Sequence, residues 1–477
     1  MKLTNTLLCV PLPAFLETPP FMPDLGLGYI AAAMRRDDLG VKLQDWNCKY
    51  TPDEFGEFLD REQFGVVGMK VFTVNFKGAL RSLALVRESL PDTVLIIGGP
   101  HPSTADQKFI FDEFPMIDLA FRGEAETAFP RIIRLLETID GKRDRISEVR
   151  AELAKIPGVV WRDSDGSAKW SDPILEDVDS LDFPAWDLIP PENYPFPVPR
   201  EITGDRHTAV APIVTSRGCP FSCTFCCAHL INGRHTRYRR AESIVDEMEL
   251  LSREYGASYF TFVDSSFMLN RKHLRSVCEE LSRRKLPILW ECIYEVQQDD
   301  PDQDDLDETL QLMYGAGCRK MIVSVETASP RIVKRVGKDF SVENIRAVHK
   351  KIREHGIITH GFFMFGFPGE TVRDLKATAA FALREPFNDV SFSVCIPLPG
   401  TEIYRELQEK HGFDRIDWNS YNVTCPPYRV AEISPGLFFR LATMANGTAV
   451  LKNRNMPLRR RGLMAARHFF SALTGRG

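Results

Sequence analysis

Three cysteines that follow an apolar stretch constrain this chain of 477 residues more than any other feature. Cys219, Cys223 and Cys226 have the spacing C-x3-C-x2-C and follow the apolar residues 209–215 after a three-residue interval. Thiolate is the ligand type that iron–sulfur clusters prefer, and Gly218 lets the loop turn tightly around a ligand. Three thiolates can bind three irons of a four-iron cluster and leave the fourth iron without a protein ligand. The spacing therefore predicts a cluster with one open, reactive iron.

A zinc knuckle or a chance group of buried thiols is the alternative interpretation of this loop. A structural zinc site would add a fourth Cys or His at a recognisable spacing. Cys227, His229 and His235 are nearby, but Cys227 directly follows Cys226 and must point elsewhere. The pattern of the downstream chain favours the cluster.

Length, charge and cysteine usage bound the class of protein. A chain of 477 residues is too long for one ordinary core, so two or three domains are expected. The net charge of -5 gives no reason to expect a nucleic-acid partner. The 11 cysteines, an odd number with no secretory leader before Cys9, favour a reducing compartment. Since no apolar run approaches the roughly 20 residues of a membrane-spanning helix, we expect a cytoplasmic protein.

Residues 1–140 alternate short apolar runs with helical patterns. Strands are expected at residues 6–10, 42–44, 65–69, 93–97 and 117–121, and helices at residues 28–36, 77–89 and 126–137. This alternation predicts an α/β domain with a doubly wound, Rossmann-like parallel sheet. Such sheets bind ligands at the carboxyl ends of their strands, where this chain carries small or glycine-rich turns.

These turns resemble the cobalamin-binding domain that precedes many radical S-adenosylmethionine (SAM) barrels. The resemblance spans the whole domain and implies cobalamin contacts from Leu25, Gly26, Phe72, Thr73, Gly98, Gly99, Pro100, Gly123 and Glu124. The D-x-H-x-x-G motif that supplies an axial histidine in methionine-synthase-like domains is absent, because residues 11–28 contain no histidine. We therefore expect cobalamin without a histidine on the cobalt, and a domain kept only as scaffold is the alternative. His101 is expected in a turn, as a loop or nucleotide-tail contact.

Residues 141–204 are expected to connect two domains. Residues 158–162 predict a strand and residues 163–167 a hairpin turn. The prolines between residues 184 and 199 predict a stiff, extended link.

Residues 205–430 contain six apolar stretches separated by helical patterns. The strands are expected at residues 209–215, 259–263, 288–292, 320–325, 359–365 and 389–394. This order predicts a partial (β/α)6 barrel with its chemistry at the carboxyl ends of the strands.

The cysteine loop and these strand ends together resemble the radical SAM superfamily. In that family the open iron chelates the amino and carboxylate groups of SAM, and reduction cleaves SAM to a 5'-deoxyadenosyl radical. The resemblance implies SAM contacts from five positions, namely Phe225 in the loop, Asp264 by the amino group, Glu326 by the ribose, and Gly366 and Pro368 by the adenine. Taken singly, Asp264 and Glu326 could be helix caps, and the Pro-Gly sequences could be turns without a ligand.

One strand end departs from the family pattern. Relatives often carry an arginine after the third strand, whereas this chain has Tyr294, Glu295 and Val296. The contact of that arginine with the SAM carboxylate is therefore not predicted for this chain. The acidic residues that follow, 299–308, predict a solvated loop, or alternatively a surface for a cationic substrate.

Residues 431–477 form a basic tail. After Ile433 there is no Asp or Glu, while eight Lys and Arg residues alternate with apolar ones. One interpretation is a surface helix packed against the barrel. The other is an amphipathic segment that makes peripheral contact with an anionic membrane and admits a lipid-like substrate.

The resemblance implies a cobalamin-dependent radical SAM enzyme that methylates an unactivated carbon through a 5'-deoxyadenosyl radical and methylcobalamin. Its cofactors would be a four-iron four-sulfur cluster, SAM and cobalamin, and its partners a small-molecule or lipid-like substrate and an external electron donor such as flavodoxin or ferredoxin. A ring-forming or rearranging enzyme, with cobalamin as electron relay or absent, is one alternative. A non-catalytic iron–sulfur electron carrier is the other.

Overall fold

The computed structural model describes residues 5–13, 22–46, 51–194, 196, 198–204, 209–297, 305–412, 416–418, 432–452, 462, 464–466 and 468. The chain forms two compact units. The first consists of Met1–Phe196, Cys227–Arg237 and Leu398–Gly400. The second consists of Pro197–Cys226, Tyr238–Pro397 and Thr401–Gly477. Each unit is built around its own sheet, and the expected α/β class is confirmed.

The first unit contains a seven-stranded sheet of order β2-β1-β3-β4-β5-β6-β7. Its strands are β1 (Thr6–Val10), β2 (Val41–Asp45), β3 (Val66–Lys70), β4 (Val94–Gly98), β5 (Leu119–Phe121), β6 (Val159–Arg162) and β7 (Ala168–Trp170). Strands β1 to β5 pair in parallel, as the alternating pattern predicts. The predicted hairpin of the connecting segment, β6 and β7, extends this sheet in antiparallel pairing, so it lies within the first unit.

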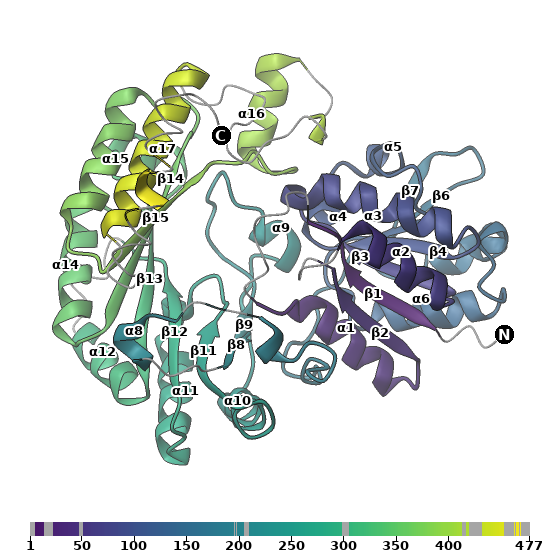
Figure 1. Cartoon of the computed structure of the whole chain (residues 1–477), viewed down its shortest axis with the longest axis horizontal. Helices are drawn as coiled ribbons and strands as arrows, with labels where there is room; N and C mark the ends of the chain where they lie inside the picture. Colours follow the sequence, from purple (N-terminus) through teal and green to yellow (C-terminus); the bar gives the residue numbers. More distant parts are fainter. Residues whose placement is uncertain are drawn as a thin grey trace. The chain divides into compact units, whose positions relative to one another are not determined.

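The helices of this unit lie between successive strands of its sheet along the chain, except for α9, which follows the cysteine loop (Figure 1). They are α1 (Leu25–Arg36), α2 (Pro52–Arg61), α3 (Phe76–Ser89), α4 (Pro100–Thr104), α5 (Ile110–Glu113), α6 (Ala128–Glu137), α7 (Arg150–Leu153) and α9 (Ala228–Asn232). Helix α2 is an element that the apolar pattern did not predict. It begins with a capping box, in which Glu54 N donates to the Thr51 hydroxyl at 3.3 Å and Thr51 N donates to the Glu54 carboxylate at 2.7 Å.

The second unit contains a six-stranded sheet of order β15-β14-β13-β12-β11-β8, with all pairs parallel. Its strands are β8 (Ala209–Ile213), β11 (Ala257–Phe262), β12 (Leu289–Tyr294), β13 (Cys318–Glu326), β14 (Ile358–Phe365) and β15 (Asp389–Val394). The six predicted strands are all present, and the predicted partial barrel is confirmed.

Helices cover one face of this half-barrel (Figure 1). They are α10 (Ala241–Tyr255), α11 (Arg271–Arg284), α12 (Leu306–Gly315), α14 (Val342–Glu354) and α15 (Val372–Arg384). Strand β14 alternates buried and half-buried residues, and its buried Phe363 contacts Phe381 of α15 at a ring distance of 6.2 Å. The half-buried residues therefore point to the interior face of the half-barrel.

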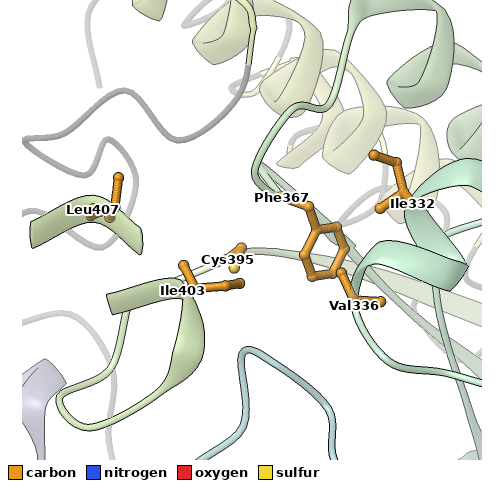
Figure 2. Packing of buried hydrophobic residues seen from close by; sticks show 6 residues of the cluster. All are labelled: Ile332, Val336, Phe367, Cys395, Ile403 and Leu407. Carbon is orange, nitrogen blue, oxygen red and sulfur yellow. The ribbon is translucent and has the colours of Figure 1, made fainter. Parts of the chain in front are cut away.

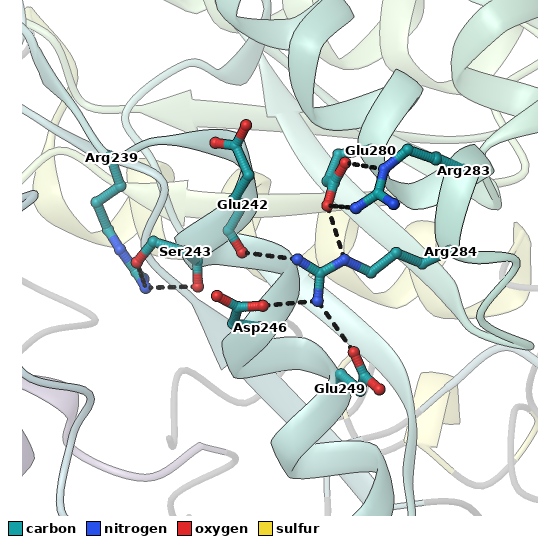
Figure 3. A network of polar contacts seen from close by, with 8 residues as sticks. All are labelled: Arg239, Glu242, Ser243, Asp246, Glu249, Glu280, Arg283 and Arg284. Atoms are coloured by element: carbon teal, nitrogen blue, oxygen red, sulfur yellow. Dashed lines mark hydrogen bonds and ion pairs between the residues drawn. The ribbon is translucent and has the colours of Figure 1, made fainter.

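Ion pairs join α10 and α11 at the surface of the second unit. Figure 3 shows Arg284 of α11 between Asp246 and Glu249 of α10, at 2.6 and 3.0 Å. The same guanidinium contacts Glu280 on its own helix at 2.7 Å. One arginine therefore links the two helices at the surface of the unit.

The longest described element of the basic tail is helix α17 (Pro435–Lys452), which packs against β15 and α15. At its end the Lys452 ammonium donates to the carbonyl oxygen of Ala382 at 2.8 Å. Over these residues the tail is the predicted helix packed against the barrel. Leu458, Leu463, Phe469 and Phe470, on which the membrane interpretation depends, lie outside the described residues. No helix in the described ranges is long and apolar enough to cross a membrane.

Candidate cluster and cofactor sites

The cysteine loop starts after β9 (Ser216–Arg217) and ends at α9. Gly218 adopts φ +107°, a conformation that favours glycine. Cys219, Cys223 and Cys226 are half-buried and form no disulfide. Burial raises the pKa of Cys223 to about 12, Lys338 opposes this, and the other two thiols raise the pKa further. The three thiols therefore lie close enough to influence one another.

The geometry of the loop differs from that of a mononuclear site. Among the described residues, no group of three or more His, Cys, Asp or Glu side chains could hold a single metal ion. A four-iron cluster has another requirement, because each thiolate binds a different iron and the sulfurs surround the cluster. A donor set of three thiolates fits a cluster with one open iron.

An apolar core fixes the end of the cysteine loop. The Phe225 ring lies 5.5 Å from the Phe367 ring. Phe225 packs against the buried cluster shown in Figure 2, which is formed by Ile332, Val336, Phe367, Cys395, Ile403 and Leu407. Thr224, which precedes Phe225, is held by two backbone hydrogen bonds. Its N–H donates to the Val336 carbonyl at 3.1 Å, and its carbonyl accepts from Ile403 N at 3.2 Å. The predicted SAM contact of Phe225 stays a prediction, and its packing is an anchor for the loop.

Asp264, at the carboxyl end of β11, fixes the start of the loop. The backbone N–H of Thr215 donates to its carboxylate at 3.0 Å, and the Thr215 hydroxyl donates at the same distance. Both the backbone N–H and the hydroxyl of Ser216 also donate to it. Burial raises the pKa of Asp264 to about 6, although these hydrogen bonds oppose the shift. The predicted contact of Asp264 with the SAM amino group remains a prediction.

Glu326 ends β13 with φ +62°, an uncommon conformation for a non-glycine residue. Its Oε1 lies 3.6 Å from Lys338 Nζ, and its buried Oε2 has no hydrogen-bond partner among the described residues. Burial raises the pKa of Glu326 to about 7, while Lys338 lowers it. A buried acceptor without a partner suits a hydroxyl donor from a ligand, such as the predicted ribose contact.

Lys338 was not predicted from the sequence. Its ammonium lies 2.8 Å from Oε1 of Glu295, which directly follows strand β12. The sequence signal that could have indicated a buried cation was Glu295, because an acid at a buried strand end requires a cationic partner.

The turn after β14 contains Gly366 and Pro368. Gly366 adopts φ +92°, and a Cβ there would lie 3.1 Å from the Phe438 ring. Its N–H donates to the Glu370 carboxylate at 2.6 Å. Glu370 is fully buried, its Oε1 has no partner within the described residues, and burial raises its pKa to about 8. Glu370 therefore shapes the turn that was predicted to lie near the adenine.

The carboxyl edge of the first sheet carries the predicted cobalamin contacts. Leu25 and Gly26 lie in the first turn of α1, Gly98 ends β4, and the other predicted residues follow β3, β4 and β5. Phe72 and the neighbouring Val74 are 36% and 46% exposed, whereas Thr73 is buried. A Cβ at Gly99, whose φ is +96°, would lie 2.8 Å from the side chain of Lys70. Exposed apolar groups beside a glycine turn fit a large, flat ligand that approaches the backbone closely.

Two polar residues at this edge are already engaged. The prediction of His101 in a turn was wrong, because Pro100 starts helix α4 and His101 lies within it, fully buried. The ring nitrogens of His101 lie 3.0 Å from the Thr73 hydroxyl and 3.3 Å from the Glu113 carboxylate. The Glu124 carboxylate accepts hydrogen bonds from Arg237, so its predicted cobalamin contact stays a prediction.

Two family models match the chain in the order of its units. The B12 binding domain model matches residues 13–133. The radical SAM superfamily model matches residues 213–382.

Known proteins resemble most of the chain. An uncharacterised methyltransferase of Pyrococcus horikoshii is 27% identical over 86% of this chain and 84% of its own length. The anaerobic magnesium-protoporphyrin IX monomethyl ester cyclase of Rubrivivax gelatinosus is 27% identical over 86% of this chain and 69% of its own. Among solved structures, the cobalamin-dependent S-adenosylmethionine radical enzyme OxsB, with aqua-cobalamin and SAM bound, has a TM-score of 0.73 at 17% identity. That similarity covers 99% of this chain and 72% of OxsB, and it shows a shared fold.

Proposed function

Because the chain belongs to the radical SAM enzymes that carry a cobalamin-binding domain, we propose that it transfers a methyl group to an unactivated carbon of an organic substrate. Its cofactors are a four-iron four-sulfur cluster, SAM and cobalamin. When bound, they supply a 5'-deoxyadenosyl radical for hydrogen abstraction and a carrier for the methyl group. The protein binds and orients these groups and excludes side reactions.

The observation that carries the proposal is the placement of the three cysteines of the loop, none of which forms a disulfide. The loop is fixed at its start by Asp264 and at its end by Phe225, within a parallel half-barrel. In the proposed site Cys219, Cys223 and Cys226 hold the cluster. The unpartnered oxygen of Glu326 accepts a hydrogen bond from the SAM ribose, and the turn at Gly366 and Pro368 lies by the adenine.

In the first unit, the proposed cobalamin site is the carboxyl edge of the sheet. Phe72 and Val74 offer apolar surface, and the turns at Gly98, Gly99 and Gly123 allow close approach to the backbone. His101 does not ligate the cobalt in this proposal, because both of its ring nitrogens have partners.

Radical ring formation is the second candidate, and the similarity to the magnesium-protoporphyrin cyclase favours it. Methyl transfer is favoured by the relative from Pyrococcus horikoshii, which matches a larger share of its own length. In the ring-forming reaction cobalamin would relay electrons or be absent.

The products of SAM separate the two candidates. Full-length protein, reconstituted with cluster and cobalamin, would be reduced under argon and incubated with SAM and candidate substrates. Methyl transfer predicts S-adenosylhomocysteine together with 5'-deoxyadenosine, and label from methyl-deuterated SAM in the product. Formation of 5'-deoxyadenosine without S-adenosylhomocysteine would support ring formation instead. Absence of both products with cluster-loaded protein would contradict either reaction.

The proposed partners are a small-molecule or lipid-like substrate and an external one-electron donor of the flavodoxin or ferredoxin type. We place the reaction in the cytoplasm, and the absence of disulfides among the nine described cysteines supports a reducing compartment. Peripheral contact of the basic tail with an anionic membrane is supported by its lack of acidic residues after Ile433. Sedimentation with anionic and neutral vesicles, with and without residues 456–477, tests this contact.

A further inference from the structure

Lys338 is a buried cation at the carboxyl end of β13. Its side chain is 2% exposed, and its ammonium lies 2.8 Å from Glu295 Oε1 and 3.6 Å from Glu326 Oε1. It also donates to the Ser324 carbonyl oxygen at 2.9 Å. Burial alone would lower the pKa of Lys338, but the two carboxylates outweigh it and raise the pKa. The ammonium therefore keeps its charge inside the protein.

The backbone beside Lys338 touches the cysteine loop. Gly337 adopts φ +72°, and a Cβ there would lie 2.7 Å from the carbonyl oxygen of Ser222 and 3.7 Å from Cys223 Cα. The carbonyl of Val336 accepts the hydrogen bond from Thr224 N. The backbone of Val336 and Gly337 therefore packs directly against the cysteine loop.

A charge at this place acts on electron transfer to the cluster. Reduction adds one negative charge to the cluster, and charge and solvent exposure around a cluster set its reduction potential. Because the side chains of Lys338 and Glu295 are largely shielded from water, solvent screens their fields weakly. A cation there stabilises the reduced state, and a carboxylate destabilises it.

We propose that Lys338 and Glu295 are positioning residues that set the reduction potential of the cluster held by Cys219, Cys223 and Cys226. The inference rests on the proposed function, because it requires the cluster to bind there. The step concerned is the transfer of one electron from an external low-potential donor. Lys338 keeps its proton in this step, and no bond of either side chain breaks.

An anaerobic redox titration tests the proposal directly. The reconstituted full-length protein is titrated with dithionite in the absence of SAM, and the reduced cluster is followed by electron paramagnetic resonance. Lys338→Met should shift the midpoint potential to more negative values. Glu295→Gln should shift it to more positive values, and Lys338→Arg, which keeps the charge, should stay near the wild-type potential.

Lys320 offers a matched control on the same strand. Its ammonium lies 2.9 Å from Glu291, and the two side chains are 12% and 1% exposed. It lies near the amino end of β13, whereas Glu326 and its Lys338 partner lie at the carboxyl end. Lys320→Met removes a largely buried, carboxylate-paired cation from the same half-barrel and should leave the midpoint potential unchanged.

The opposite signs of the shifts separate an electrostatic effect from loss of structure. Shifts of Lys338→Met and Glu295→Gln in the same direction, or an equal shift in Lys320→Met, would overturn the inference. If Lys338→Met does not fold, the Glu295→Gln and Lys338→Arg proteins decide, and an unshifted Glu295→Gln potential rejects the inference. A wild-type protein that binds no cluster would instead reject the proposed function.

Discussion

Arg237 holds the carboxylate of Glu124 with both terminal nitrogens, at 2.8 and 2.6 Å. The two side chains are 15% and 3% exposed, and the same carboxylate accepts from the backbone N–H of Glu176 at 2.7 Å. This bidentate pair fixes the segment Cys227–Arg237 within the first unit. Because Cys227 directly follows Cys226, the pair also restrains the end of the cysteine loop.

Replacing Glu124 by Gln should therefore weaken cluster retention as well as stability. Breaking a buried ion pair costs about 3–5 kcal/mol, which urea unfolding would detect. The specific expectation is a lower iron and sulfide content per protein after desalting. Asp118→Asn is the matched control, since Asp118 binds Arg87 at 2.9 Å and is 7% exposed but precedes β5. Equal iron loss in the control would show that the effect is general destabilisation.

Alanine at Cys219, Cys223 or Cys226 should each abolish the visible absorbance of the cluster and the cleavage of SAM, because three thiolates are required to hold three irons. Cys227→Ala should retain both, since adjacent side chains diverge. The reconstituted variants would be compared by absorbance and by 5'-deoxyadenosine formation. Full cleavage activity in Cys223→Ala would end the cluster assignment.

Gly337→Ala should displace the cysteine loop. The substitution forces a non-glycine residue into φ +72°, at a cost on the order of 1–3 kcal/mol, and places a methyl group 2.7 Å from Ser222 O. Gly256 is the control, because it has φ +65° and nothing within 4 Å of an added Cβ. Both variants should lose stability in urea, and only Gly337→Ala should also lose iron. Normal iron content in Gly337→Ala would contradict the contact.

Glu370 should make the folded protein less stable as pH rises. Burial raises the pKa of this carboxyl from 4.5 to about 8, with Asp374 adding to the shift and the Gly366 N–H and Arg331 opposing it. The folded state therefore binds more protons than the unfolded state between these values, so the free energy of unfolding falls as pH increases through that range. Each unit of pKa shift corresponds to about 1.4 kcal/mol.

Glu370→Gln should remove this part of the pH dependence, because the amide stays neutral and can still accept from Gly366 N. Urea unfolding of both proteins from about pH 5 to about pH 8 gives the difference curve. Asp264 and Glu326 also have raised pKa values, but they are common to both proteins and cancel. A difference that does not change with pH would contradict a buried neutral Glu370.

The strands were the most predictable part of this fold. Strand β1 has the predicted bounds Thr6–Val10, because a parallel strand covered on both faces is a continuous apolar run. Helix α2 was not predicted, because the prediction used apolar runs and the start of this helix is polar. The capping box of Thr51 and Glu54 was the sequence signal for it. The pairing of β5 with β6 joins residues far apart in the chain, and no local pattern reveals such a pair.

The site was predictable in its motifs and less so in its supports. The cysteines, Asp264 and Glu326 stand at the strand and loop ends where their spacing puts them. The residues that support the site were not predictable in this way. Lys338 belongs to no motif, and its role depends on its ion pair with Glu295, which is distant in the sequence. Supporting contacts of this kind come from tertiary packing, which the order of residues specifies only indirectly.

The chain enters the second unit, returns to the first for Cys227–Arg237, and returns again for Leu398–Gly400. Because each unit is made of three separate chain segments, a single genetic crossover could not exchange one whole unit for another. A recombined protein that took residues 1–196 from a distant homologue would need them to fit Cys227–Arg237 and Leu398–Gly400 of the other parent. Descent with the two modules inherited together is the simpler route, and a chimaera should retain all three segments from one parent.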